Sequence, residues 1–306
     1  MKQKSLTFIY ILLILSMLFW GTSFVFTAAV LPVLDPVSLV FSRLAISSVL
    51  LWIVVLLFFR KQKIAKSFLK WVFLLAVFEP FIYFLGETYG LQRVSPVVVS
   101  IIISTIPVFT AVVMSVFFHA KLSALNFLGV FISLSGVLCM IINKDLTFSA
   151  DLTGILLVFI AVFSTIGYSV ILHKLSKDIN PIWLVAAQNT FGALLFLPLF
   201  LFWGETPNYE NGRAFLSFLS VKETMWFYII ILAVFCSALA FIFYLFAVQR
   251  IGVAKSTVFT NLIPIITALI SYFLIDEKFT PMKIAGIVIV IVGLLLTQTK
   301  KRLPPF

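Results

Sequence analysis

The sequence predicts an all-α integral membrane protein of ten transmembrane helices, arranged as two inverted repeats of five helices each. Composition is the first observation: 62% of the 306 residues are hydrophobic and 11% are charged, whereas soluble domains carry about a quarter charged residues. The second is a series of continuous apolar segments, each near the roughly 20 residues that span the hydrocarbon core of a bilayer. The third is an internal repeat, in which residues recur at an offset of 157.

Ten apolar segments are long enough to span a bilayer. They cover residues 6–30, 36–59, 69–89, 95–118, 124–143, 152–173, 181–203, 225–249, 253–275 and 281–299. Their apolar runs are continuous rather than alternating, which favours helices over a membrane β-barrel. The first run is longer than the core of a cleaved signal peptide, about 7–15 residues, so we predict that it remains as a membrane helix.

The distribution of charge predicts the orientation in the membrane. An N-terminus on the cytoplasmic side places fifteen Lys and Arg residues inside and six outside, which follows the positive-inside rule. Nine acidic residues, Glu87 among them, then fall on the outer side. We therefore predict a multi-pass protein of the inner (plasma) membrane with both termini cytoplasmic. The net charge of +11 reflects this topology and not a nucleic-acid partner.

The repeat supports a division into two halves, 1–146 and 147–306. An offset of 157 aligns Gln92-Arg93 with Gln249-Arg250 and Ile106-Pro107 with Ile263-Pro264, within eleven identities over 48 ungapped positions. Because five helices per half is an odd number, the second half enters the membrane from the opposite side. Two inverted halves can exchange conformations and turn an inward-open cavity outward, as carriers require.

Several short motifs of the first half resemble a known family. They are Trp20-Gly21, Gln92-Arg93, Ser95-Pro96, Ile106-Pro107 and the pair Gly129 and Gly136. Together they resemble the EamA domain of the drug/metabolite transporter superfamily, and the resemblance covers nearly the whole chain. It implies a ten-helix carrier of small metabolites. The first half departs from the pattern at His119-Ala120, where the second half has Asp276-Glu277.

Two ionisable residues lie deep within predicted spans, away from the helix ends: Arg43 and Glu79. Charged groups within the bilayer cost about 2.5–3.5 kcal/mol or more, so they are expected to face a partner or a wet cavity. Their depths allow an ion pair, direct or through water. One interpretation is a purely structural pair. The other is that Arg43 binds an anionic group of a substrate while Glu79 binds a cation or serves as a proton-coupling site. Pro80 interrupts the helix beside Glu79.

Polar and aromatic residues at helical spacing extend this candidate site. The predicted substrate-binding residues are Trp20, Arg43, Glu79, Tyr83, Ser104, Tyr168, Gln188, Asn189, Tyr244 and Asn261. Upstream of the 157-residue register the repeat continues at an offset of 145, which pairs Arg43 with Gln188, so the two halves differ where a charged group would bind. Small and polar stripes also serve plain helix packing in lipid, and that alternative remains open here.

Other residues receive structural interpretations. Gly129, Gly136, Gly286 and Gly293 are spaced seven apart within each half and predict close helix packing. The two cysteines lie in apolar segments without metal-ligand spacing. We expect no metal, no cofactor and a functional monomer.

These observations predict a secondary transporter, expected to export a small metabolite such as an amino acid by alternating access around a central cavity. The alternative is an importer or facilitator of a sugar-like or nucleotide-linked metabolite. A channel is disfavoured because a filter motif is missing, and an intramembrane enzyme because no nucleophile and base cluster at depth. The chain has no P-loop for ATP-driven transport.

Overall fold

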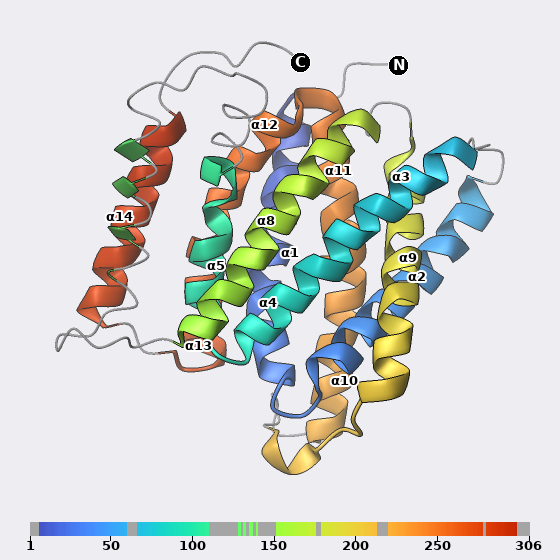
Figure 1. The fold of residues 1–306 in the computed structure, drawn as a ribbon, viewed down its shortest axis with the longest axis horizontal. Helices are drawn as coiled ribbons and strands as arrows, with labels where there is room; N and C mark the ends of the chain where they lie inside the picture. Colours follow the sequence, from blue (N-terminus) through green and yellow to red (C-terminus); the bar gives the residue numbers. More distant parts are fainter. Residues whose placement is uncertain are drawn as a thin grey trace.

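The computed structural model describes residues 6–59, 66–109, 151–175, 179–212, 220–277 and 280–298, with seven further positions between 128 and 139. All regular structure within these ranges is helical, and the helices form a bundle (Figure 1). Six helices of the described part are long and apolar enough to cross a membrane, and three shorter apolar helices accompany them. The protein is therefore a polytopic helical membrane protein. The predicted helix 124–143 lies largely outside the described residues, so the count of ten stays a prediction.

The helices follow one another in chain order. In the first half they are α1 (Leu6–Val30), α2 (Pro36–Phe58), α3 (Lys66–Ala76), η1 (Val77–Ile82), α4 (Tyr83–Leu91) and α5 (Pro96–Ser104). In the second half they are α8 (Leu152–Leu175), α9 (Pro181–Trp203), η2 (Tyr209–Asn211), α10 (Val221–Ile231), η3 (Leu232–Leu239), α11 (Ala240–Ile251), α12 (Val253–Thr257), η4 (Val258–Leu262), α13 (Ile263–Leu274) and α14 (Pro281–Gln298). In Figure 1 the start of α1 and the end of α14 lie at the same end of the bundle.

Helices α2 and α9 begin through the same local chemistry. Asp35 caps α2 by accepting a hydrogen bond from the backbone of Ser38, and Asn180 caps α9 by accepting one from the backbone of Ile182. In both helices proline follows the cap. The first N–H groups of a helix have no partner within it, so the missing N–H of proline costs no hydrogen bond there. Both helices are 23 residues long.

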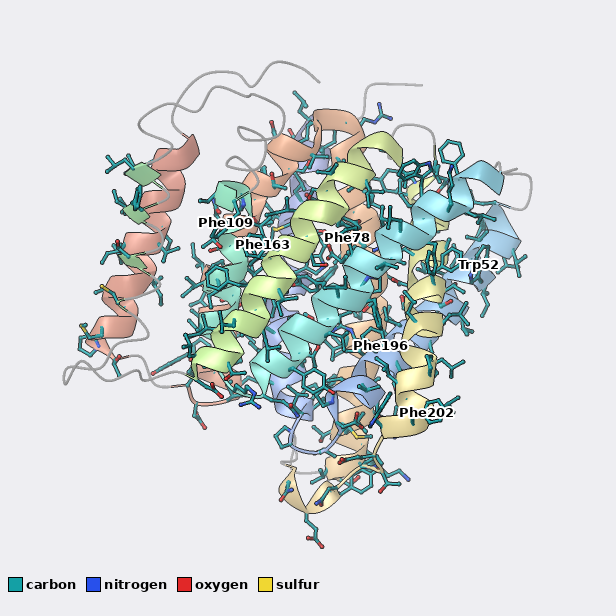
Figure 2. All side chains as sticks on the ribbon, viewed as in Figure 1. Trp52, Phe78, Phe109, Phe163, Phe196 and Phe202 are labelled. Carbon is teal, nitrogen blue, oxygen red and sulfur yellow. The ribbon has the colours of Figure 1, made fainter. Side chains whose placement is uncertain are left out.

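Helices α2 and α9 pack side by side and run antiparallel. Asp35, before α2, accepts a hydrogen bond from the backbone N–H of Glu205, which follows α9. Further along α2, the hydroxyls of Ser48 and Thr190 lie 2.6 Å apart, and the indole N–H of Trp52 donates to Thr190 at 2.8 Å. Figure 2 labels Trp52 at this seam. Early residues of one helix thus meet late residues of the other.

Two spans of the bundle contain π-helical segments at their centres. In the first, η1 joins α3 to α4, and Glu79 within it has extended backbone angles (φ −141°, ψ 115°) just before Pro80. In the second, η3 joins α10 to α11. The 157-residue offset carries 77–82 onto 234–239, inside η3. We call these two the bent spans.

The proline motifs interrupt two further helices at equivalent places. Helix α5 ends at Ser104, one turn before Pro107, and the backbone N–H of Val108 instead bonds the carbonyl of Thr105. In the second half the tighter helix η4 ends at Leu262 and α13 begins at Ile263, followed by Pro264. Each proline lacks the N–H that a continuous helix would use, so the repeated motif produces a repeated break.

Contacts between the halves come in matched pairs. Helix α1 packs against α11 and α13, and α8 packs against α4 and α5. In the same way α2 contacts η3 while α9 contacts η1, and α5 contacts α13. Figure 1 shows α1 and α8 running in opposite directions, α1 from the upper end and α8 from the lower end.

The predicted packing glycines lie at close contacts where they can be described. A Cβ added to Gly136 would lie 2.8 Å from the carbonyl oxygen of Gly286 and 2.7 Å from the backbone nitrogen of Val290. Gly129 and Gly293 are also buried. The segment that holds Gly136 therefore approaches α14 to backbone distance.

A close glycine contact with backbone joins α4 to α8, and it carries a stability prediction. A Cβ on Gly86 would collide with the backbone oxygen of Leu157. Because a backbone atom cannot rotate away, Gly86→Ala must separate the two helices, and overpacking of this kind costs about 1–3 kcal/mol. We expect a lower midpoint of thermal unfolding in detergent. At Gly90 the nearest atom is a methyl carbon of Val158, so Gly90→Ala should lower the midpoint less. An equal effect of both changes would contradict this interpretation.

Candidate functional site

A cavity lies between the two halves at the level of the bent spans. Its walls come from α1, α2, η1, α4, α5, α8, α11, α12, η4 and α13. The free space between these walls is about 700 Å³ including the part open to solvent, and about 60 Å³ of it can hold the centre of a water molecule. The second volume is room for only a few waters, at about 10–15 Å³ each. The part of the cavity that water can occupy is therefore small.

Six of the ten predicted binding residues line this cavity: Trp20, Arg43, Glu79, Tyr83, Tyr168 and Tyr244. Phe84 and Phe241 join them, so the wall is largely aromatic. Hydroxyl groups of Ser23, Thr165, Ser169, Thr257 and Thr260 supply most of the remaining polar surface. The cavity thus combines a few charged groups with an apolar wall, as small-molecule sites commonly do.

Arg43 is almost fully buried, with 1% of its surface exposed. Its Nε donates to the hydroxyl of Ser237 at 2.9 Å and its Nη2 donates to the hydroxyl of Ser23 at 3.3 Å. Its Nη1 is buried without a hydrogen-bond partner. The guanidinium carbon lies 4.5 Å from the centre of the Phe84 ring. The side chain is fixed from two sides and keeps one donor unused.

Arg43 and Glu79 were expected to pair directly or through water, and the direct ion pair is not formed. No ion pair joins the two side chains, both of which belong to the described residues, and serine hydroxyls instead occupy two nitrogens of Arg43. The acid that interacts electrostatically with Arg43 is Glu87. The extended backbone at Glu79 breaks the regular helix on which the depth comparison relied.

Glu87 is a cavity residue that the sequence placed on the outer surface. It is 1% exposed, lines the cavity and accepts a 3.3 Å hydrogen bond from Thr88. The spacing of Glu79, Tyr83 and Glu87 is four and four, which puts all three on one helical face. That spacing could have identified Glu87 as a cavity residue. Its position near the end of the predicted helix suggested instead that its side chain is exposed to solvent. The site therefore holds one guanidinium and two carboxyl groups.

The four remaining predicted binding residues do not line the cavity, although the structure describes all four of them. Ser104 donates its hydroxyl to the carbonyl of Ile101 at 2.7 Å. Asn261 lies on η4, and its Oδ1 is buried without a partner. Gln188 and Asn189 are 1% and 2% exposed and bond to other helices. Their direct contact with substrate remains a prediction.

Aromatic contacts hold the remaining cavity side chains in place. The ring of Trp20 lies 5.0 Å from that of Phe241 and 5.2 Å from that of Tyr244. The hydroxyl of Tyr168 is buried beside the amide of Gln188 without forming a hydrogen bond of ordinary geometry. Behind this wall, Phe78 packs against Gly167 of α8, near the middle of the bundle in Figure 2.

An exposed ion pair lies at one end of the bundle, away from the cavity lining. Arg93 donates to the carboxylate of Asp151 at 2.7 Å, and both side chains are over a third exposed. The hydrogen bond from Arg93 and one from the backbone of Thr153 hold the pKa of Asp151 below its usual value. Exposed pairs of this kind contribute little to stability.

Comparison with known proteins identifies relatives over nearly the full length. An uncharacterized transporter of Archaeoglobus fulgidus is 23% identical over 95% of this chain and 99% of its own. The uncharacterized transporter YyaM of Bacillus subtilis is 23% identical over 97% of this chain and 96% of its own. A protein of known crystal structure shares the fold with a TM-score of 0.67 and 14% identity, covering 96% of this chain and 97% of that one.

The family comparison matches both halves separately. The model of the EamA-like transporter family matches residues 7–142 and again residues 152–299. The family that the sequence motifs resemble is thereby confirmed. The chain belongs to the EamA-like transporter family.

Proposed function

We propose that the protein is a secondary transporter that exports a small amphoteric metabolite, with amino acids bearing an apolar side chain as the substrate class. The observation that carries this proposal is the buried, unused Nη1 donor of Arg43 at a cavity that also holds Glu79 and Glu87. A guanidinium suits a carboxylate, and a carboxyl group suits an ammonium. The aromatic wall suits an apolar side chain between them.

The mechanism that we propose is alternating access between two inverted halves, 1–146 and 147–306. The matched contacts between the halves, the antiparallel α2 and α9, and the equivalent breaks at Pro107 and Pro264 support it. In such a carrier the two halves exchange conformations around a fixed site. The small cavity is consistent with a closed conformation. For transport, helices must separate first on one side of the membrane and then on the other.

We place the protein in the inner (plasma) membrane with both termini cytoplasmic, acting as a monomer. The excess of basic residues on one side supports this orientation. The start of α1 and the end of α14 lie at the same end of the bundle (Figure 1), as an even number of spans requires.

A binding assay on the purified protein in nanodiscs tests the substrate class. Radiolabelled L-phenylalanine is the probe, competed by unlabelled L-leucine, 3-phenylpropanoate and 2-phenylethylamine. We expect L-leucine to compete, while the analogues that lack one charged group compete about tenfold less well or worse, since a hydrogen bond to a charged group contributes about 1.5–3 kcal/mol. Preferential competition by glucose or a nucleotide sugar would instead favour the alternative substrates. Resistance of an overexpressing strain to toxic amino-acid analogues would support export, and hypersensitivity would contradict it.

A further inference from the structure

The two bent spans leave backbone carbonyls that side chains of other helices bond. In a π-helical segment the regular pattern of backbone bonds shifts, and a buried carbonyl left free must find another donor. In η1 the carbonyl of Phe78 accepts a bond from the hydroxyl of Ser164 at 2.5 Å in addition to one from the backbone N–H of Tyr83. Just after η3, the carbonyl of Ala240 accepts one from Ser16. Each bent span is thus held from outside itself.

Two neighbouring residues of α9 hold both bent spans at once. The Nε2 of Gln188 donates to the backbone carbonyl of Glu79 at 3.0 Å. The Nδ2 of Asn189 donates to the backbone carbonyl of Ser237 at 2.9 Å and to the hydroxyl of Ser47 at 2.7 Å. Successive residues of a helix point about 100° apart because a turn takes 3.6 residues. One dipeptide can therefore face two different spans.

The bonds of this dipeptide lead to both charged ends of the cavity. Gln188 holds the backbone of Glu79, whose side chain lines the cavity. Asn189 holds the backbone of Ser237, whose hydroxyl accepts the bond from Nε of Arg43. A path of hydrogen bonds joined by covalent links thus runs behind the cavity wall from the backbone of Glu79 to the guanidinium of Arg43. The path lies outside the cavity lining, and Gln188 and Asn189 are almost fully buried.

We propose that Gln188 and Asn189 are positioning residues that set the separation between Glu79 and Arg43. That separation determines which spacing of ammonium and carboxylate a substrate must have. Gln188 is the repeat counterpart of Arg43, and Ser237 is the counterpart of Pro80, so the first half supplies the charges and the second half supplies their support. This inference rests on the proposed function, because it concerns recognition of an amphoteric substrate at the same cavity.

The selectivity for charge spacing provides the test. Binding of L-phenylalanine and of L-β-homophenylalanine, whose carboxylate is one methylene further from the ammonium, is measured on the purified wild type. We expect wild type to prefer one of them. In Gln188→Met and in Asn189→Leu, which remove the donors with little change in size, the ratio of the two affinities should move towards one by about fivefold to tenfold, as expected for loss of a buried hydrogen bond.

The double variant tests whether Gln188 and Asn189 act through one path or as two independent contacts. If both residues belong to one path, Gln188→Met combined with Asn189→Leu should change the ratio no more than either change alone, because a path broken once is already broken. If the effects of the two single changes on the affinity ratio multiply in the double variant, the two residues act independently and the proposed path is overturned. Thr190→Val is the matched control: it removes bonds between α2 and α9 at the next residue and should leave the ratio unchanged.

The outcomes distinguish this inference from the proposed function. A wild type that binds neither compound overturns the proposed function and this inference with it. A wild type that binds both equally, or variants that keep the wild-type ratio, overturn this inference alone. If Gln188→Met or Asn189→Leu does not yield folded protein, Gln188→Ala and Asn189→Ala remove the same donors without forcing a larger side chain or a new charge into the site, and the same ratios decide.

Discussion

Replacing Arg43 by glutamine is expected to lower the affinity for carboxylate-bearing substrates by about tenfold to 100-fold, since a hydrogen bond to a charged group contributes about 1.5–3 kcal/mol. The guanidinium is 1% exposed, and its Nη1 has no partner within the protein. A substrate carboxylate is the group that would satisfy it. The measurement is binding of L-phenylalanine and of its methyl ester, which lacks the carboxylate charge.

The comparison of acid and ester controls for general damage to the fold, because such damage would lower the affinity for both compounds. Wild type should prefer the acid, whereas Arg43→Gln should bind acid and ester about equally. Arg43→Lys should recover part of the preference, because lysine keeps the charge but lacks the planar fork of donors. Ser23→Ala removes one acceptor of the guanidinium and serves as the matched control, with a smaller loss. A wild-type preference for the acid in Arg43→Gln would show that the carboxylate binds elsewhere.

Replacing Glu79 by glutamine is expected to abolish accumulation of substrate against its gradient. Glu79 lines the cavity, is 6% exposed and is held through its backbone rather than by an ion pair, so its carboxyl group is free to take up and release a proton. One pH unit supplies about 1.4 kcal/mol per proton, enough for about tenfold accumulation. In proteoliposomes with a gradient of one pH unit, wild type should approach that value and Glu79→Gln should only equilibrate.

Glu87→Gln is the matched comparison for Glu79→Gln. Both acids are buried at the same cavity, but Glu87 interacts electrostatically with Arg43, which gives it a charge partner that Glu79 lacks. The other ionisable groups facing Glu79 are tyrosines on its own span, on α8 and on α11, namely Tyr83, Tyr168 and Tyr244. We expect Glu87→Gln to retain accumulation. Loss of accumulation in Glu87→Gln but not in Glu79→Gln would reverse the two roles.

The sequence predicted the membrane-spanning helices because their signal is local. Apolar length identified α1, α2, α8 and α9 nearly to the residue. Pro80 predicted the interruption beside Glu79, whereas 95–118 and 253–275 were predicted as continuous helices and the structure interrupts both near their prolines. The boundaries of 124–143 and the full count of spans remain predictions, since that segment lies largely outside the described residues.

The candidate site was predicted less completely. Spacing identified six residues that line the cavity, from Trp20 to Tyr244. The sequence missed Glu87, because nearness to a helix end suggested solvent exposure, whereas packing of α4 against α8 buries it. It also paired Arg43 with Glu79 from depth alone. Depth does not fix the rotation of a helix, and the guanidinium bonds serines of α1 and η3 instead.

The sequence by itself thus determined that the chain spans a membrane, where several of its helices begin, that one of them breaks beside Glu79, and that Arg43 and Glu79 require an explanation. These follow from the cost of placing polar groups in lipid and from local backbone chemistry. Only the tertiary structure decided what each polar side chain does. Gln188 and Asn189 are as polar as any binding residue, yet they bond carbonyls of the bent spans. Such partners lie far away in the sequence, and they depend on how each helix is rotated against its neighbours.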